Sequence, residues 1–399
     1  MKRVRWAVAV AAVGLVLSTA ACGTGDAGSS SSTIKVGYLA SLTGPAANDA
    51  ARDVAGAKVA VEELNAKGGV DGHKIELIVR DDKADPTAGT REARDLVLTD
   101  RVNVLAGGNI SSVAAAIQQV AGQTKTPYVI STAGAASLIE ETGNPYTFRS
   151  WTNTSSLPGP AAEWAAQQGF KRIAIVYANY TNGIEQTESF KKIVAAKDPT
   201  AEIVGEIPVE LTDTDFSSSI NRLMAMKPDA VFMGGIFGST LQGIIKQALP
   251  RGLYHNAKAM AFISNSDLKA LSALGLPSGQ QIAYNNYFPT IDDPFATEFD
   301  AKIEESTGQQ ADGSDFVGYI TMRWVAAAIE KAKSTDRGAI AKALPGLELD
   351  TFVGPVTMRT DGQATGQAWY GVLVNDGKSG LTISDAKTAK SDGFLSPVK

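Results

Sequence analysis

From Ile34 onward, short apolar runs alternate with longer amphipathic stretches along the chain. The apolar runs predict strands, which fall at 34–39, 75–79, 102–106, 128–131, 172–177 and 230–233. Most of these runs are apolar throughout and do not alternate with polar residues, which is typical of strands covered on both faces of a parallel sheet. The pattern therefore predicts an α/β protein with helices on both sides of its sheets.

Helices are predicted between these strands. Apolar residues recur at helical spacing from Val54 to Leu64, and the pair Gly68–Gly69 ends that helix. Asp85–Pro86 begins the next helix, with the proline at its first position. After Trp151 the alternation restarts with a helix around 161–168, and the chain contains no tandem sequence repeat. The restart indicates a second doubly wound lobe that repeats the architecture of the first but not its sequence.

The beginning of the chain has a different character. Basic residues precede the apolar run 7–17, which is too short to span a bilayer, and small residues then lead to Cys22, the only cysteine. This resembles the lipobox of bacterial lipoproteins, which implies a signal peptide over 1–21 and a diacylated Cys22 that anchors the mature protein to a membrane. The stretch 22–33 then holds the lipidated cysteine and a flexible tether. The alternative is a soluble secreted protein with a stray cysteine.

Composition narrows the function classes. The formal net charge is −5, and removal of the leader's three basic residues makes it −8 (−5 minus 3), which argues against nucleic acid as a partner. With Cys22 used as the anchor no disulfide is possible, and His73 and His255 have no Cys/His cluster around them, so we expect neither a zinc site nor a cofactor. The length is sufficient for two domains, each held by its own core.

Enzymatic motifs are missing from the sequence. There is no G-x-S-x-G elbow, and Gly377–Ser379 lacks the upstream glycine of a phosphate-binding loop. A hydrolase would therefore need an unrecognised Ser/Asp arrangement. We expect a binding protein and not an enzyme.

Loops of small polar residues leave the ends of the predicted strands at 43–45, 107–112 and 132–137. Ligands of open parallel sheets bind beyond these carboxyl ends. Each loop opens a helix, so its free backbone N–H groups and the positive end of the helix dipole favour an anion such as a carboxylate. Ser111 or Ser112 either caps its helix or binds the ligand.

Motifs throughout residues 34 to about 385 carry a family resemblance; they are Ser41–Pro45, Glu63–Val70, Asp81–Pro86, Lys227–Ala230 and Val353–Val356. The chain resembles the leucine/isoleucine/valine-binding proteins, the type I extracytoplasmic binding subunits of ABC importers. The resemblance implies two doubly wound lobes that are joined by three crossovers and close on a ligand like a hinge. The crossovers are expected near Ser150–Trp151, near Asn285–Tyr287 and near Pro355.

These crossovers divide the chain. The first lobe is expected to hold 34–151 and 286–355, the second 152–285 and 356–385, and the C-terminal tail 386–399. The resemblance also implies a monomer that is anchored at the outer face of the cell membrane and delivers a small molecule to an ABC permease. The alternative is an extracytoplasmic sensor on the same fold that signals to a membrane partner.

The resemblance implies a clamp for the ligand's carboxylate in the first lobe. Ser111 falls on the serine of this clamp, and Ala133 and Ala135 fall on the loop that supplies backbone groups. Asn109 and Ser112 are the neighbouring candidates on the serine's loop.

Other positions depart from relatives that bind aliphatic amino acids. The segment 264–267 has no glutamate to hold an ammonium, and Ala135 lacks a hydroxyl. Asp49 and Asp267 are each either a substitute acid or a solvated surface residue. The aromatic walls are replaced by Asp49, Asn182, Ile236 and Ser314, while Tyr180, Phe237 and Phe316 either line the pocket or pack in the core. We therefore predict a small polar, carboxylate-bearing ligand, which is an amino acid-like compound, an amide or an aromatic or other organic acid.

Overall fold

The computed structural model describes residues 33–44, 46–288, 293–351, 354–375, 380–390, 394–395 and 398. The predicted signal peptide, Cys22 and nearly all of the tether lie outside these residues. Among the described residues, no helix is both long and apolar enough to span a membrane.

The first sheet is entirely parallel, with the strand order β2-β1-β3-β4-β5. Its strands are β1 (Ile34–Ala40), β2 (Ile75–Asp81), β3 (Val104–Gly107), β4 (Tyr128–Ile130) and β5 (Thr147–Arg149). Adjacent residues of β1 enter different cores: Tyr38 packs toward helices α1 (Ala47–Ala66) and α12 (Gly313–Ala332), and Leu39 toward α2 (Pro86–Leu98) and α3 (Ser111–Thr124). Both faces of the sheet are thus covered, as the uninterrupted apolar runs predict.

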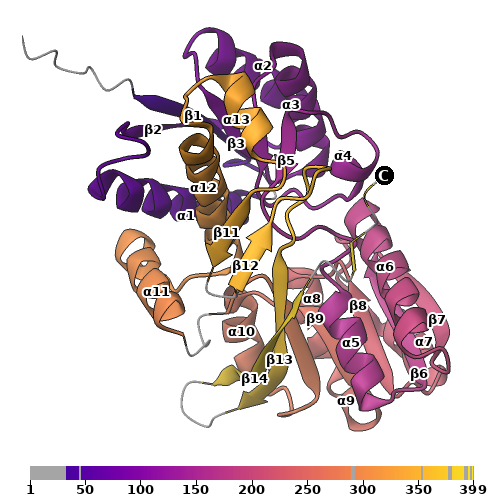
Figure 1. Ribbon diagram of the computed structural model, residues 1–399. Helices are drawn as coiled ribbons and strands as arrows, with labels where there is room; N and C mark the ends of the chain where they lie inside the picture. The colour runs from indigo at the N-terminus through magenta and orange to yellow at the C-terminus, as the bar shows by residue number, and fades with distance from the viewer. Residues whose placement is uncertain are drawn as a thin grey trace, which may run out of the picture.

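The helices of this lobe come from both halves of the chain (Figure 1). They are α1 (Ala47–Ala66), α2 (Pro86–Leu98), α3 (Ser111–Thr124), α4 (Ser137–Glu140), α11 (Pro294–Thr307), α12 (Gly313–Ala332) and α13 (Arg337–Ala343), and a hairpin of β11 (Glu348–Thr351) and β12 (Gly354–Thr357) follows. Helices α1 and α12 pack in close contact through glycines. A Cβ on Gly56 of α1 would lie 1.7 Å from the carbonyl oxygen of Asp315 in α12.

The second sheet has the order β14-β13-β10-β9-β8-β6-β7. Its strands are β6 (Arg172–Ala178), β7 (Glu202–Val209), β8 (Ala230–Gly234), β9 (Lys258–Phe262), β10 (Gln281–Asn285), β13 (Gln367–Asn375) and β14 (Leu381–Lys390), and its helices are α5 (Gly159–Gln168), α6 (Thr181–Lys197), α7 (Ser217–Ala225), α8 (Gly238–Ala248), α9 (Leu253–Asn256) and α10 (Asn265–Ser272). The strands from β7 to β10 are parallel, whereas β13 and β14 add an antiparallel edge. The prediction of two doubly wound α/β lobes is confirmed, with a mixed second sheet.

The chain crosses between the sheets after β5, after β10 and before β13. The last crossing lies between Ala364 and Gln367, later than Pro355, because the preceding segment still runs beside β5. Gly362 accepts the N–H of Arg149 over 2.7 Å, and Ala364 donates to the carbonyl of Arg149 over 3.0 Å. Strand β14 continues to Lys390, so residues 386–390 belong to the second sheet and not to a tail.

Candidate functional site

The loops at the carboxyl edge of the first sheet bring Ser111 and Ala135 together. The N–H of Ala135 donates a hydrogen bond to Oγ of Ser111 over 3.1 Å. Helix α3 begins at Ser111 after Ile110, and among the described residues no side chain caps its N-terminus. Ser112, the next residue, is exposed. The Ser111 hydroxyl, which accepts from the Ala135 N–H and keeps its own proton to donate, thus lies at an uncapped first turn, and such a combination suits an anion.

Asn109 and Ala133 hold these loops in place. Asn109 Nδ2 donates to Asp53 Oδ2 over 3.0 Å and to Thr132 Oγ1 over 2.9 Å, and its Oδ1 accepts the N–H of Ser41 over 3.0 Å. Ala133 is fully buried, and its N–H donates to the carbonyl of Gly108 over 2.9 Å. Both residues are therefore engaged in tying one loop to the next.

The second lobe faces these loops with the N-terminal turn of α6. Asn182 is half-buried, and its Nδ2 lies 3.8 Å from the point that a Cβ on Gly134 would occupy. Tyr180 is half-buried, its hydroxyl donates to the carbonyl of Gly235 over 3.3 Å, and burial raises its pKa. Nearby in the chain, Ile236 is buried, whereas Phe237 at the start of α8 is 42% exposed. Phe237 is therefore the apolar side chain of this set that is open to solvent.

Two charged residues that the sequence did not single out lie at the same place. Glu185 of α6 accepts the N–H of Ala136 over 3.3 Å and also the hydroxyl of Thr154. Arg149 is fully buried, and its Nη2 donates to the carbonyl of Ala135 over 2.7 Å. Burial lowers the pKa of Arg149 to about 10, although the negative charge of Glu185 opposes that shift. The 133–136 loop is thus supported by an arginine beneath it and a glutamate from the other lobe.

Asp267 is neither a solvated surface residue nor a free acid. It is 2% exposed and completes a capping box at the start of α10. Its Oδ2 accepts the hydroxyl of Ser264 over 2.7 Å, and its Oδ1 accepts Nε2 of Gln242 over 3.2 Å. Both carboxylate oxygens are therefore engaged in local structure, and of the two alternatives for Asp267 the solvated surface residue is wrong.

Asp49 is an exposed acid in the first turn of α1. The protein around it raises its pKa, and the charge of Asp267 from the second lobe raises that pKa further, whereas Arg52 lowers it. Solvent reaches the side chain, yet protein charges of both lobes act on it. Asp49 is therefore an exposed acid on which charges of both lobes act.

Phe316 packs in the core near the crossovers. It is fully buried, with its ring 5.0 Å from that of Trp151 and 5.6 Å from that of Tyr287. Of the two alternatives for Phe316, the structure shows core packing.

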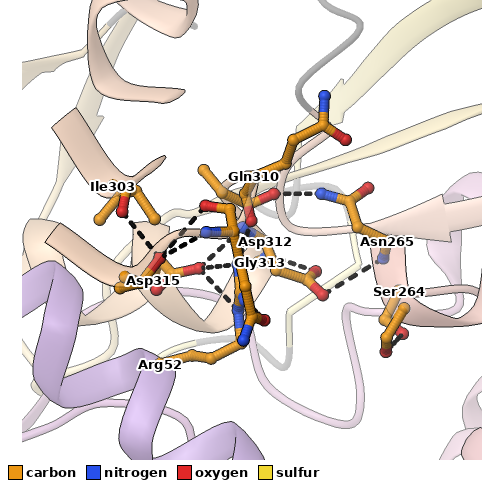
Figure 2. Close-up of polar contacts among 12 residues, drawn as sticks. Arg52, Ser264, Asn265, Ile303, Gln310, Asp312, Gly313 and Asp315 are labelled. Carbon is orange, nitrogen blue, oxygen red and sulfur yellow. Dashed lines mark hydrogen bonds and ion pairs between the residues drawn. The ribbon is translucent and has the colours of Figure 1, made fainter. Parts of the chain in front are cut away.

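A further contact joins the lobes beside the second crossover (Figure 2). Asp312, the N-cap of α12, accepts the N–H of Asn265 over 3.2 Å through Oδ2 and Nδ2 of Asn285 over 3.3 Å through Oδ1. Arg52 of α1 pairs with Asp315 of α12 over 2.6 Å. Burial raises the pKa of Asp312 to about 6 and that of Asp315 to about 7. The start of α12 thus carries two buried carboxyl groups: that of Asp312 binds the second lobe, and that of Asp315 binds α1.

The described residues give less support to a metal site or to a site in another hollow of the surface. It contains no group of three or more His, Cys, Asp and Glu residues that could hold a metal ion. A surface hollow of about 620 Å³ lies beside β5 and α13, lined in part by Tyr146 and Lys342, and a second of about 490 Å³ lies beside α2. Neither hollow includes the residues that meet between the lobes.

Two doubly wound lobes with polar loops meeting across three crossovers define a two-lobed solute-binding protein. The chain belongs to the periplasmic binding protein family, which matches residues 33–379. It is a solute-binding protein of the ABC-transporter class, a class that binds small molecules outside the cytoplasm and is not an enzyme family.

The chain is similar to several known proteins. It is 30% identical to the Leu/Ile/Val-binding protein BraC3 of Rhizobium johnstonii, over 84% of this chain and 90% of that protein. It is 27% identical to the Leu/Ile/Val-binding protein of Escherichia coli K12, over 89% of this chain and 93% of that protein. Among solved structures, the ABC-transporter solute-binding protein of Rhodopseudomonas palustris BisB5 in complex with 3,4-dihydroxybenzoic acid is 25% identical and superimposes with a TM-score of 0.78, over 90% of this chain and 98% of that one.

Proposed function

We propose that this protein captures a small carboxylate-bearing solute between its lobes and delivers it to the permease of an ABC importer. The observation that carries this proposal is the Ser111 hydroxyl, which is held by the Ala135 N–H and lies at the uncapped start of α3. The similar proteins are named for leucine, isoleucine and valine or solved with 3,4-dihydroxybenzoic acid, and the carboxylate is the group that these compounds share.

Within that class, aromatic and other organic acids fit better than aliphatic amino acids. An ammonium buried without a carboxylate partner costs about 3–5 kcal/mol. Asp267 is engaged in its helix cap, and Oε2 of Glu185 already accepts the N–H of Ala136 and the hydroxyl of Thr154. Asp49 remains as an exposed acid. The second lobe thus supports an ammonium poorly, while the first lobe retains its carboxylate clamp.

A thermal-shift screen followed by calorimetry tests this proposal on the purified protein. The panel is leucine, valine, benzoate, 4-hydroxybenzoate and 3,4-dihydroxybenzoate, with benzamide as the uncharged match to benzoate. A ligand at about a hundred times its dissociation constant stabilises the fold by about 2.7 kcal/mol. Aromatic carboxylates should raise the melting temperature and benzamide should not. Equal binding of benzamide and benzoate would contradict the carboxylate clamp, and a largest shift with leucine would contradict the ammonium argument.

We also propose that Cys22 carries a lipid anchor and that the protein works as a monomer. The support for the anchor is the leader pattern in front of Cys22, which lies outside the described residues. Cys22→Ser should release the protein from the membrane without changing its ligand affinity, and sedimentation of the released protein should give one chain. A Cys22→Ser protein that stays in the membrane fraction would overturn the anchor.

A further inference from the structure

Asp53 of α1 lies directly beneath the loops that carry Ser111 and Ala135. It is fully buried. Its Oδ2 accepts Nδ2 of Asn109 over 3.0 Å and the hydroxyl of Ser131 over 2.7 Å, and the hydroxyl of Tyr38 faces the same carboxyl group. One carboxylate therefore meets groups from the ends of β1, β3 and β4.

Through these bonds Asp53 is connected to the loops that follow β1, β3 and β4. Asn109 also binds the N–H of Ser41 and the hydroxyl of Thr132, and it stands two residues before Ser111. Ser131 begins the segment that presents Ala135. A shift of the Asp53 carboxylate would thus move both partners of the Ser111–Ala135 contact.

Helix α12 encloses Asp53 from the other side. A Cβ on Gly318 would lie 1.9 Å from the carbonyl oxygen of Asp53 and 2.9 Å from its Oδ1. The close approach of this glycine fixes the carboxyl group between the helix and the loops.

We propose that Asp53 is a positioning residue whose ionised carboxylate sets the spacing of the three loops, and through them the affinity of the site, without touching the ligand. This inference rests on the proposed carboxylate-binding function. An ionised carboxylate is a stronger acceptor for Asn109 and Ser131 than a protonated one. Protonation of Asp53 should therefore loosen the loops and weaken binding.

The surroundings of Asp53 place its protonation near neutral pH. Burial raises its pKa to about 7, while the hydrogen bonds from Ser131 and Asn109 and the nearby hydroxyl of Tyr38 lower that pKa and the charge of Asp49 raises it. Among the described residues, Tyr38 of β1 and Tyr128 of β4 are also titratable groups whose charge is coupled to Asp53, and α12 presents Gly318 there.

The stability of the fold responds to Asp53 in the opposite direction. Because folding raises the pKa of Asp53 above its ordinary value, the protonated form is favoured in the folded state. This contribution is fully present below the unfolded pKa of about 4 and is lost as the pH rises through about 7. If Asp53 were merely structural, the ligand affinity would change with pH in the same direction as the free energy of unfolding. If Asp53 positions the loops, the affinity rises with pH while the free energy of unfolding falls.

The test measures benzoate affinity by calorimetry and the free energy of unfolding by urea, both from about pH 6 to about pH 8. Benzoate stays ionised throughout, so its own charge is constant. The wild type should bind at least about tenfold more weakly at the acid end, and Asp53→Asn should be weak throughout, with a much smaller pH dependence that comes from groups such as Asp312. Ser131→Ala removes a donor that lowers the pKa of Asp53, so it should move the midpoint to higher pH.

Asp336→Asn is the matched control. Asp336 is an exposed N-cap of α13 in the same lobe, where it accepts the N–H of Ala339 over 2.9 Å. It should keep the wild-type pH profile. Unchanged affinity in Asp53→Asn, or a wild-type affinity that falls together with stability as the pH rises, would overturn the proposal.

A wild type that binds neither benzoate nor any other member of the panel would defeat the proposed function and leave the loop network to be tested directly. Amide hydrogen exchange, corrected for its intrinsic pH dependence, would then be compared over 107–112 and 131–137. Faster exchange in Asp53→Asn than in Asp336→Asn supports positioning by Asp53, and equal exchange overturns it.

Discussion

The backbone N–H of Asn265 in the second lobe donates a hydrogen bond over 3.2 Å to the carboxylate of Asp312 in the first lobe (Figure 2). The side-chain amide of Asn265 also donates to the carbonyl of Ala311. Asn285, at the second crossover, donates to the other oxygen of Asp312. One buried carboxylate therefore joins the cap of α12, the crossover and the second lobe, and it favours this relative placement of the lobes.

Asp312→Ala should shift the protein toward a more open form. The change removes hydrogen bonds to a charged acceptor, each worth about 1.5–3 kcal/mol, and some of them cross between the lobes. Small-angle scattering should show a larger radius of gyration without ligand, and the ligand affinity should fall roughly tenfold or more.

The comparison for this variant is Asp336→Ala. Asp336 also caps a helix of the first lobe, so both changes lose a cap worth about 0.5–2 kcal/mol. Only Asp312 contacts the second lobe in this pair. Equal radii of gyration for the two variants would show that the Asp312–Asn265 contact does not hold the lobes together.

The free energy of unfolding should fall as the pH rises from about 5 to about 8. Burial raises the pKa of Asp312 to about 6 and that of Asp315 to about 7, so the folded state binds more protons than the unfolded state in this range. Their contribution is fully present below about pH 4 and is lost through the folded pKa values. Arg52→Met should steepen the fall, because Arg52 lowers the pKa of Asp315. Urea unfolding at several pH values measures this dependence, and a flat profile would contradict it.

Ser111→Ala should weaken binding of a carboxylate ligand by about 1.5–3 kcal/mol, the range for a hydrogen bond to a charged group. The expected loss is roughly ten- to a hundredfold in calorimetry. Ser112→Ala is the neighbouring comparison, since Ser112 is exposed and Ser111 contacts Ala135. If the two variants bind alike, the hydroxyl of Ser111 has no special part in the site.

Helix starts and strands that short sequence patterns encode were predicted well. Asp85 accepts the N–H of Ala88 over 2.7 Å and Pro86 opens α2, as the pair Asp85–Pro86 indicated. The antiparallel edge of the second sheet was not predicted. Strand β13 pairs with β10, which ends at Asn285, far back along the chain, and no local pattern encodes that pairing.

The candidate site also has a part that local sequence predicts and a part that it does not. The loops with Ser111 and Ala135 were predicted, because small polar residues after apolar strands mark a sheet edge. Arg149 and Glu185 were missed, since their importance comes from burial and from partners distant in sequence, such as Gln363 for Arg149. Asp267 did have a readable signal: the spacing of Ser264 and Asp267 is that of a capping box.

Gly56→Ala should destabilise the fold by about 1–3 kcal/mol, the usual cost of overpacking. The added Cβ would lie 1.7 Å from the carbonyl oxygen of Asp315, so α1 and α12 must separate. In an open helix the same change would be favourable by up to about 1 kcal/mol, which makes Gly122→Ala in α3 a suitable control. There the new Cβ meets only the side chain of Asn144, at 3.3 Å from its Nδ2, and a shift of a few tenths of an ångström in that side chain makes room for it. Separation of α1 from α12 also displaces Asp53, so Gly56→Ala should weaken ligand binding while Gly122→Ala should not. Urea unfolding and calorimetry measure the two effects, and equal stability of the variants would show that the α1–α12 contact is looser than these glycines indicate.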